Sequence, residues 1–263
     1  MRELERDDLP SSLSPTPLIV VGRGRVDRSL AAAAGRAEIE VRLVAHEDLE
    51  AMPRRSAILL CVPDDAIAVV ARELAAAEPA LVGHVSGATT LDALAAGGKQ
   101  GAASFSLHPL QTFADGETPV EGTPAAIAGS TEESLAYARS LAVALGMRPF
   151  EVPEEKRAAY HAAAAMASNL LVALEESAAE VLARIGIEDP GELLAPLVLR
   201  TAANWAERGP DALTGPIARG DRSTVQSHRV ALAASAPEFV RLYDALAMRA
   251  EAMSWESVHG VST

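Results

Sequence analysis

The residues with the clearest chemical meaning are two glycines that follow a short apolar run near the start of the chain. Residues 18–21 lead into Gly-Arg-Gly-Arg-Val-Asp, and an alanine-rich stretch follows. This spacing is typical of a loop that holds the diphosphate of a dinucleotide at a helix N-terminus. The candidate contacts are Gly22, Arg23, Gly24, Arg25 and Val26. Asp27 replaces the third glycine, so the loop is either a nucleotide site or a plain turn in which Asp27 stabilises the helix N-terminus.

Two further clusters stand directly after apolar runs that predict strands. They are Cys-Val-Pro-Asp-Asp at residues 61–65 and His-Val-Ser-Gly at residues 84–87. Ligands of open α/β sheets bind beyond the carboxyl ends of the strands, so Pro63 is a candidate for cofactor binding, and Ser86 and Gly87 are expected on the same rim of the sheet. A helix cap at Asp64 or Asp65, with no ligand, is the favoured explanation of the first cluster.

Residues 106–113, Ser-Leu-His-Pro-Leu-Gln-Thr-Phe, are dense in hydrogen-bonding side chains at another strand exit. Within them, His108 suits proton transfer and Gln111 suits substrate binding. The alternative is a structural turn that is held in place by Phe113.

A long apolar helix is predicted over residues 154–185, and it carries a polar stripe. His161 and Ser168 are seven residues apart, which puts them at nearly the same angle on a helix that turns about 100° per residue, and Asn169 lies beside them. Buried polar groups need partners, so the stripe either faces a cleft and takes part in catalysis or is satisfied inside a core. His161 and His108 are the candidate proton donors, because an ordinary imidazole titrates near neutral pH.

The last cluster, residues 212–221, contains Thr214 and Arg219. Both are candidates for substrate binding, and Arg219 could pair with a substrate carboxylate. A turn at Gly215 and a helix cap at Asp221 are the structural alternative. No spacing of Cys and His in the sequence is typical of a metal site.

Up to about residue 150, short apolar runs alternate with alanine-rich helical segments, which predicts a parallel sheet covered by helices. The predicted strands are residues 18–21, 39–44, 57–62, 81–85, 102–105, 125–128 and 147–152, and the helices between them are 25–34, 65–76, 91–96 and 132–145. The interval between the first and third strands is too short for two full helices. We therefore expect the second helix to shrink to about one turn near residues 47–52.

After Pro153 the strand pattern ends, and long helices are predicted over about 154–185, 190–208, 221–235 and 238–257. The predicted fold class is α/β, with an N-terminal Rossmann-like, mostly parallel sheet followed by an all-α C-terminal domain. Three parts are expected: a flexible arm over residues 1–17, a dinucleotide-binding domain over 18–152, and a helical substrate and dimerisation domain over 153–263.

The composition limits the possible partners. Apolar residues make up 49% and charged residues 22% of the chain, so a packed core is expected. The net charge of −13 disfavours nucleic acid and anionic membranes as partners. The sequence shows neither a secretion signal nor a charge-free membrane-spanning stretch, so we expect a cytoplasmic protein. The single cysteine, Cys61, is expected to be a strand thiol.

In their order along the chain, these motifs resemble a bacterial family of Rossmann-like proteins with a C-terminal helical domain of unknown function. The resemblance rests on the glycine loop, Val-Pro-Asp-Asp, His-Val-Ser-Gly, residues 106–113, Tyr-His-Ala-Ala-Ala with Ser-Asn-Leu-Leu, and residues 213–221. The family belongs with the 6-phosphogluconate dehydrogenase-like oxidoreductases, whose members include pyrroline-5-carboxylate, prephenate and ketopantoate oxidoreductases. The resemblance implies NADP binding, a dimer made by the helical domain and an active site in the cleft between the domains. It also implies that Ser86 and Gly87 lie beside the nicotinamide, and that His108, Gln111, His161 and Asn169 face the cleft.

We therefore expect an oxidoreductase that uses NADP, or NAD, on a small carboxylate-bearing carbonyl or imine substrate, and that forms a homodimer. The alternative is a degenerate Rossmann scaffold without nucleotide, acting as a non-catalytic dimeric binding or regulatory protein. Asp27 and the short second strand–helix unit motivate this alternative.

Overall fold

The computed structural model of the chain describes residues 17–51, 53, 56–74, 78–95 and 102–259. The chain forms two compact units, Met1–Met166 (unit 1) and Ala167–Thr263 (unit 2). Apart from Pro17, the predicted arm lies outside the described residues, as do the last residues of the helices predicted to end at 76 and 96. The functional boundary proposed at residue 152 stays a prediction.

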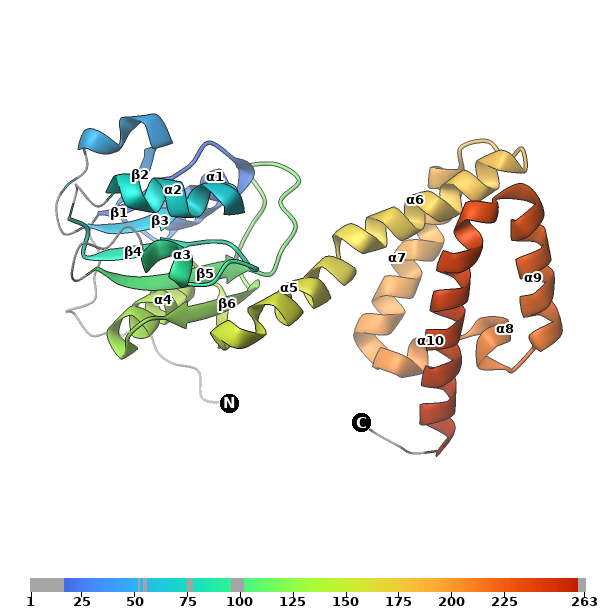
Figure 1. Cartoon of the computed structure of the whole chain (residues 1–263). Coiled ribbons are helices and arrows are strands. Elements are labelled where there is room, and N and C mark those ends of the chain that lie inside the picture. The colour runs from blue at the N-terminus through green and yellow to red at the C-terminus, as the bar shows by residue number, and fades with distance from the viewer. Residues whose placement is uncertain (1–16, 52, 54–55, 75–77, 96–101, 260–263) are drawn as a thin grey trace. The chain divides into compact units, whose positions relative to one another are not determined.

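Unit 1 is built on a seven-stranded sheet with the order β2-β1-β3-β4-β5-β6-β7 (Figure 1). The strands are β1 (Leu18–Val21), β2 (Val41–Val44), β3 (Ala57–Leu60), β4 (Leu81–His84), β5 (Ala103–Pro109), β6 (Pro124–Gly129) and β7 (Arg148–Glu151). All neighbouring strands are parallel except β5 and β6, which are antiparallel. This sheet, followed by helices, confirms the predicted fold class.

Helices cover both faces of the sheet, which explains why its central strands are apolar on both sides. In β1, Leu18 and Val20 pack with α1 (Arg25–Arg36) and α4 (Glu132–Ala144). The alternate residues, Ile19 and Val21, pack with α2 (Asp64–Leu74) and α3 (Asp92–Ala95). A strand buried on both faces reads as a continuous apolar run, and this is the pattern that β1 and β3 show.

The second strand–helix unit is short, as predicted from the chain length. In the described part of the chain between β2 and β3, the helical structure is a 3₁₀ helix, η2 (His46–Ala51). The chain therefore passes from β1 to β2 on one side and on to β3 on the other side of β1. In open α/β sheets, such a reversal of direction leaves a crevice beyond the carboxyl ends of the strands.

Strand β5 is longer than predicted and carries polar residues that the sequence suggested would follow it. It continues to Pro109 because residues 105–109 pair with β6, from Phe105 opposite Gly129 to Pro109 opposite Ala125. Phe105 and Leu107 point into the core with α1 and α4. Ser106 and His108 therefore lie on the opposite face of the strand.

The prediction of a single helix over residues 154–185 is wrong, because the helical segment is interrupted at residues 167 and 168. A 3₁₀ turn, η4 (Glu154–Lys156), leads into α5 (Arg157–Met166), and α6 (Asn169–Arg184) begins after Ser168. Ser168 has non-helical backbone angles (φ −131, ψ −86), and its hydroxyl donates to Asn169 Oδ1 at 2.8 Å. Serine and asparagine favour helix ends because their side chains compete for backbone hydrogen bonds. The helical angle that was used to group His161 with Ser168 and Asn169 therefore does not apply.

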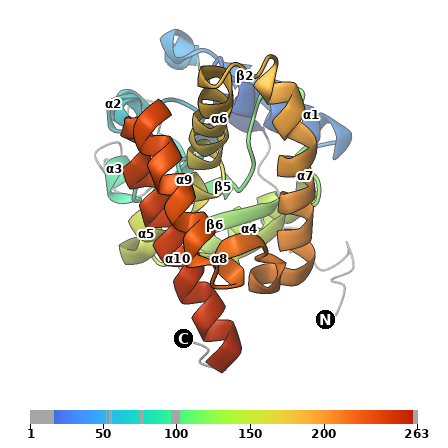
Figure 2. The same cartoon turned by 90° about the vertical axis from the view of Figure 1, so that its right-hand side faces the viewer.

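In its described part, unit 2 is entirely helical, as predicted. After α6 it contains α7 (Pro190–Arg208), α8 (Gly215–Ala218), α9 (Arg222–Ser235) and α10 (Val240–His259), with 3₁₀ turns at Gly209–Ala212 and Pro237–Phe239. Helix α6 packs on α7 and α9, and α10 packs on α8 and α9 (Figure 2). None of the described helices has the length and apolar character that a bilayer crossing requires.

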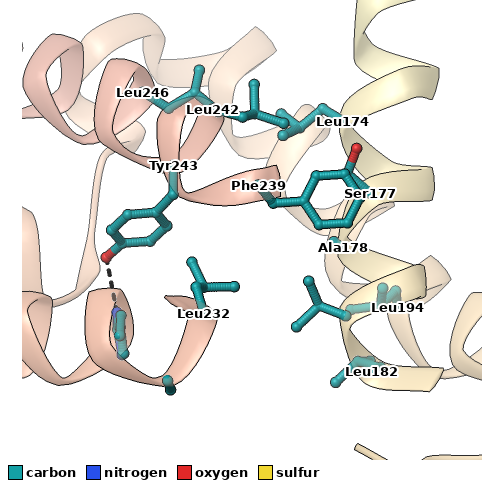
Figure 3. A pocket seen from close by; sticks show the side chains of 13 residues that line it. Leu174, Ser177, Ala178, Leu182, Leu194, Leu232, Phe239, Leu242, Tyr243 and Leu246 are labelled. Carbon is teal, nitrogen blue, oxygen red and sulfur yellow. Dashed lines mark hydrogen bonds between the residues drawn. The ribbon is translucent and has the colours of Figure 1, made fainter. Parts of the chain in front are cut away.

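Unit 2 leaves much of its apolar surface uncovered. Among its described residues, the buried hydrophobic side chains are only Val225, Ala236 and Ala247. A pocket of about 420 Å³ lies between α6, α7, α9 and α10, and its lining is mostly apolar, with leucine as its most frequent residue (Figure 3). Its polar edge is formed by His228, whose Nδ1 lies 2.9 Å from the Tyr243 hydroxyl.

Candidate functional site

A pocket of about 320 Å³ lies in unit 1 at the carboxyl ends of β1, β3, β4 and β5. The strand register places Val21, Leu60, His84 and Ser106 in one row across the sheet, so the loops that follow them meet at one edge. The pocket is lined by Val26, Cys61, Val62, Asp64, Val85, Ser86, Gly87, His108, Pro109, Gln111, Phe113 and His161. Six of the sequence-predicted site residues are thus brought together: Val26, Ser86, Gly87, His108, Gln111 and His161.

The glycine loop approaches β3 closely at Gly22. A Cβ on Gly22 would lie 2.6 Å from the carbonyl oxygen of Cys61, so no other residue fits without movement of the backbone. The Gly22 N–H donates to the carbonyl of Val44 at 3.1 Å. The first glycine of the motif is therefore required by the packing of β1 against its neighbours.

Asp27 is buried beneath the loop rather than aimed into the pocket. It is 2% exposed, its Oδ1 accepts the N–H of Gly24 at 2.6 Å, and it is not among the residues that line the pocket. A carboxylate in the first turn of a helix is stabilised by the helix dipole and by such a bond. The alternative in which the loop is a plain turn and Asp27 stabilises the helix N-terminus predicts this contact.

Two arginines join the glycine loop to the segment that follows β5. Arg25 Nη1 donates to the carbonyl of Phe113 at 3.3 Å, and Arg28 Nε donates to the carbonyl of Gly24 at 2.8 Å. A Cβ on Gly116 would lie 2.7 Å from Arg28 Nε. Both guanidinium groups are exposed, so they are placed to meet an anion at the N-terminus of α1.

Two histidines converge on Gly87. A Cβ on Gly87 would lie 2.6 Å from His161 Nδ1 and 2.9 Å from His108 Nε2. The His161 Nδ1 atom is buried and has no hydrogen-bond partner among the described residues. Glycine at position 87 therefore lets both imidazole edges approach the backbone closely on the pocket wall.

His108 is held by Tyr160, and its charge state differs from that of a free imidazole. Its Nδ1 lies 2.7 Å from the Tyr160 hydroxyl. Burial, together with the neighbouring His161 and Arg157, lowers the pKa of His108 to about 4. Burial raises the pKa of Tyr160 to about 12. At neutral pH His108 is thus an uncharged imidazole, which differs from the expectation that it titrates near the working pH.

Sequence reasoning missed Arg157, which connects α5 to two strands. This side chain is 0% exposed. Its Nη2 donates to the carbonyl of Ser86 at 2.6 Å, and its Nη1 donates to Ser106 Oγ at 2.8 Å and, more loosely, to Glu154 Oε1 at 3.4 Å. A charged residue at the start of a helix is normally solvated, so only its place in an otherwise apolar helix could have drawn attention to it.

Arg157 also acts on His84, which ends β4. His84 is 0% exposed. Burial and then the charge of Arg157 lower its pKa to about 4. His84 is therefore neutral in the folded chain at ordinary pH.

The other sequence-predicted residues are placed differently. Pro63 and Arg23 are exposed and do not line the pocket, although Val62 and Asp64 on either side of Pro63 do. The remaining four residues belong to unit 2: Ser168, Asn169, Thr214 and Arg219. Thr214 and Arg219 flank α8, where both are exposed. Their roles stay predictions.

Comparison with known proteins gives a match to one family model and to several solved structures. Residues 123–250 match the family described as Domain of unknown function (DUF2520). No protein with curated annotation matches the chain.

Solved structures resemble the chain over nearly its whole length. A protein of Thermotoga maritima is 26% identical with a TM-score of 0.75, and the match covers 92% of this chain and 100% of that one. A candidate NADP oxidoreductase of Bacteroides fragilis is 24% identical with a TM-score of 0.74, covering 91% and 99%. Pyrroline carboxylate reductase of Plasmodium falciparum, solved with NADP bound, is 15% identical with a TM-score of 0.56, covering 92% and 99%.

These likenesses confirm the family resemblance that the motifs indicated. The chain contains a Rossmann-like sheet, its residues 123–250 match the DUF2520 family model, and it shares its fold with a candidate NADP oxidoreductase and with an NADP-bound pyrroline carboxylate reductase.

Proposed function

We propose that this protein is an NADP(H)-dependent oxidoreductase that acts on a carbonyl or imine group of a small substrate. The observation that carries the proposal is the convergence of His108 and His161 on Gly87, in a pocket that also reaches Val26 in the first turn of α1. The similarity in fold to NADP oxidoreductases supports the nature of the cofactor.

The residues present fit a dinucleotide. At one end, the glycine loop has no side chains at Gly22 and Gly24, and the first turn of a helix leaves N–H groups without intrahelical partners. Arg25 and Arg28 lie beside it. At the other end, the pocket beside Gly87 and the His161 Nδ1 atom, which has no hydrogen-bond partner among the described residues, offer a polar contact for the amide of a nicotinamide ring. When bound, the nicotinamide would supply the hydride.

The chain itself would orient the substrate and provide a hydrogen-bond donor at the reacting heteroatom. His108 and His161 are the proposed donors, and Gln111 at the pocket mouth is the proposed substrate contact. The sequence assigns further substrate contacts to Ser168, Asn169, Thr214 and Arg219. Arg219 would take a carboxylate of the substrate.

Titration with NADPH tests the proposal, with NADPH fluorescence as the readout. We expect saturable binding to the wild-type chain. We expect tighter binding to Asp27→Gly, because this change frees the Gly24 N–H and removes a negative charge from the diphosphate site. Gly35→Ala is a matched control in the same helix, since a Cβ on Gly35 meets nothing within 4 Å. Its affinity for NADPH should equal that of the wild type.

A second function is favoured by the Asp27–Gly24 bond itself. The Asp27 carboxylate accepts the hydrogen bond of a loop N–H group that would otherwise be open to a phosphate. This is expected of a scaffold that has lost its nucleotide and serves as a non-catalytic dimeric protein. In that case the wild-type chain would not bind NADPH, and Asp27→Gly would restore binding. Saturable binding by the wild type would rule this second function out.

We further propose that unit 2 forms a homodimer. Its helices expose large apolar side chains, including Val172 (69%), Leu193 (61%), Leu197 (63%) and Leu199 (71%). Monomeric soluble proteins rarely expose large contiguous apolar patches. Size-exclusion chromatography with light scattering should give a dimer for the wild type and a monomer for Leu193→Glu/Leu197→Glu. Val69→Glu, at an apolar position of unit 1 that is 45% exposed, should remain dimeric.

A further inference from the structure

We infer that Tyr160 is a positioning residue of this site: its hydroxyl donates to His108 Nδ1 and so fixes His108 as the neutral tautomer with its proton on Nε2. His108 then presents an uncharged N–H donor to the pocket. The inference rests on the proposed function only for the identity of the group that accepts this N–H.

The geometry holds the tyrosine against the histidine. The hydroxyl lies 2.7 Å from His108 Nδ1, and the two rings meet edge to face with centroids 5.6 Å apart. The ring of Phe150 also packs edge to face against the tyrosine ring, with centroids 5.9 Å apart. One turn earlier in α5, Arg157 is bonded to Ser86 and to Ser106, and Ser106 lies two residues before His108 in β5. The helix that carries the tyrosine is therefore bound to the strand that carries the histidine.

The ionisation of the two groups is consistent with the inferred direction of the hydrogen bond, in which the Tyr160 hydroxyl donates and His108 Nδ1 accepts. A neutral imidazole has one N–H and one acceptor nitrogen. With a pKa raised to about 12, Tyr160 keeps its proton at neutral pH and can donate it. When Nδ1 is the acceptor, the proton of the ring must be on Nε2, the edge that faces Gly87.

The charged and titratable groups around His108 keep it uncharged. His161, at a ring-centroid distance of 6.0 Å, and the buried Arg157 both disfavour an imidazolium, and burial acts in the same direction. Asp64 acts in the opposite direction but is the smallest of these influences. A neutral N–H donor suits a substrate heteroatom that has a lone pair. The site thus favours a carbonyl oxygen or an uncharged imine nitrogen over an iminium N–H.

The test is NMR of ¹⁵N-histidine-labelled protein without cofactor, recorded across pH. The chain contains six histidines, and the His108→Gln variant identifies the signal of His108. For the wild type we expect the Nε2–H tautomer and no protonation of His108 between pH 6 and pH 8, the ordinary range of an imidazole.

Tyr160→Phe keeps the ring that packs on His108 and Phe150 and removes only the hydroxyl. We expect the tautomer preference of His108 to weaken and its pKa to rise by about 0.7 units, the equivalent of one ordinary hydrogen bond. Tyr243→Phe is a matched control, because the Tyr243 hydroxyl lies 2.9 Å from His228 Nδ1 and forms another His–Tyr contact among the described residues. It should change the His228 signal and leave that of His108 unaltered.

An Nδ1–H tautomer in the wild type would overturn the inference, as would a His108 signal that is the same in Tyr160→Phe and wild type. Because the measurement needs no nucleotide, a failure of NADPH to bind would refute the proposed function without touching this result. If NADPH does bind and a substrate is found, Tyr160→Phe should lower kcat with little change in KM for NADPH.

Discussion

We expect the substitution Arg157→Met to lower the stability of unit 1 strongly. The methionine keeps the length and apolar stem of the arginine but removes a guanidinium that is bonded to the Ser86 carbonyl, to Ser106 Oγ and to Glu154. Two of these acceptors are buried, and a buried acceptor left without a partner costs about 1–3 kcal/mol. The Glu154 side chain is 35% exposed, so water can replace much of the interaction that Glu154 loses with Arg157.

The sum of these effects is a loss of about 3 kcal/mol in the free energy of unfolding, within the range for breaking a buried ion pair. Arg139→Met is the matched control, because Arg139 pairs with Glu151 at the surface, where both side chains are about half exposed. Exposed pairs of this kind contribute about 0–1 kcal/mol.

Hydrogen exchange measured by mass spectrometry is the suitable assay. Tryptophan fluorescence would report on the wrong part of the chain, since both tryptophans, Trp205 and Trp255, belong to unit 2. For Arg157→Met we expect the amides of β4 and β5 to exchange on the order of a hundredfold faster. A change under threefold, or one equal to that of Arg139→Met, would refute the argument that this arginine binds α5 to the sheet.

Three further predictions follow from the site. Gly87→Ala should abolish NADPH binding while costing about 1–3 kcal/mol of stability, because its Cβ would lie 2.6 Å from His161 Nδ1; unchanged affinity by fluorescence titration would contradict this. His84 has a folded-state pKa of about 4, below its unfolded value near 6.5, so the unfolded chain binds more protons and stability is lost as the pH falls from about 6.5 to 4. His84→Leu should flatten that slope in urea unfolding curves, and an unaltered slope would show that His84 is not responsible. Finally, burial and then Asp27 raise the pKa of the Cys61 thiol, so this single cysteine should react slowly with a thiol reagent at pH 8 and rapidly in urea; equal rates would show that the thiol is open to solvent.

Much of unit 1 could be predicted because its strands are buried on both faces. Four-residue runs such as those of β1 and β3 are apolar throughout, and the helices between them repeat apolar residues every three or four positions. The length of β5 could not be predicted in this way. Its second half alternates core residues with Ser106 and His108, and their partners come from a helix about 50 residues later in the chain.

The candidate site was predictable where it depended on strand exits. Ser86, Gly87, His108 and Gln111 line one pocket because parallel strands end at a common edge. Arg157 and Tyr160 were not predictable as parts of the site, since no local pattern distinguishes a buried arginine from a solvated one. The break at Ser168 was hidden by the apolar, alanine-rich sequence on both sides of it, which continues the helical pattern without interruption.

The alternation of side chains in β5 makes the length of this strand critical. One residue inserted between Ala103 and Phe105 would turn every later side chain to the opposite face, sending Leu107 toward Tyr160 and the imidazole of His108 into the hydrocarbon interior. The segment after Pro109 is a loop that leads to β6, so it has no alternation of faces to keep, but its first residues are still constrained because Gln111 and Phe113 line the pocket and Gly116 packs on Arg28. Natural variation in chain length among relatives should therefore accumulate beyond Gly116, and an engineered tag or label placed at the exposed Glu117 should leave the pocket intact.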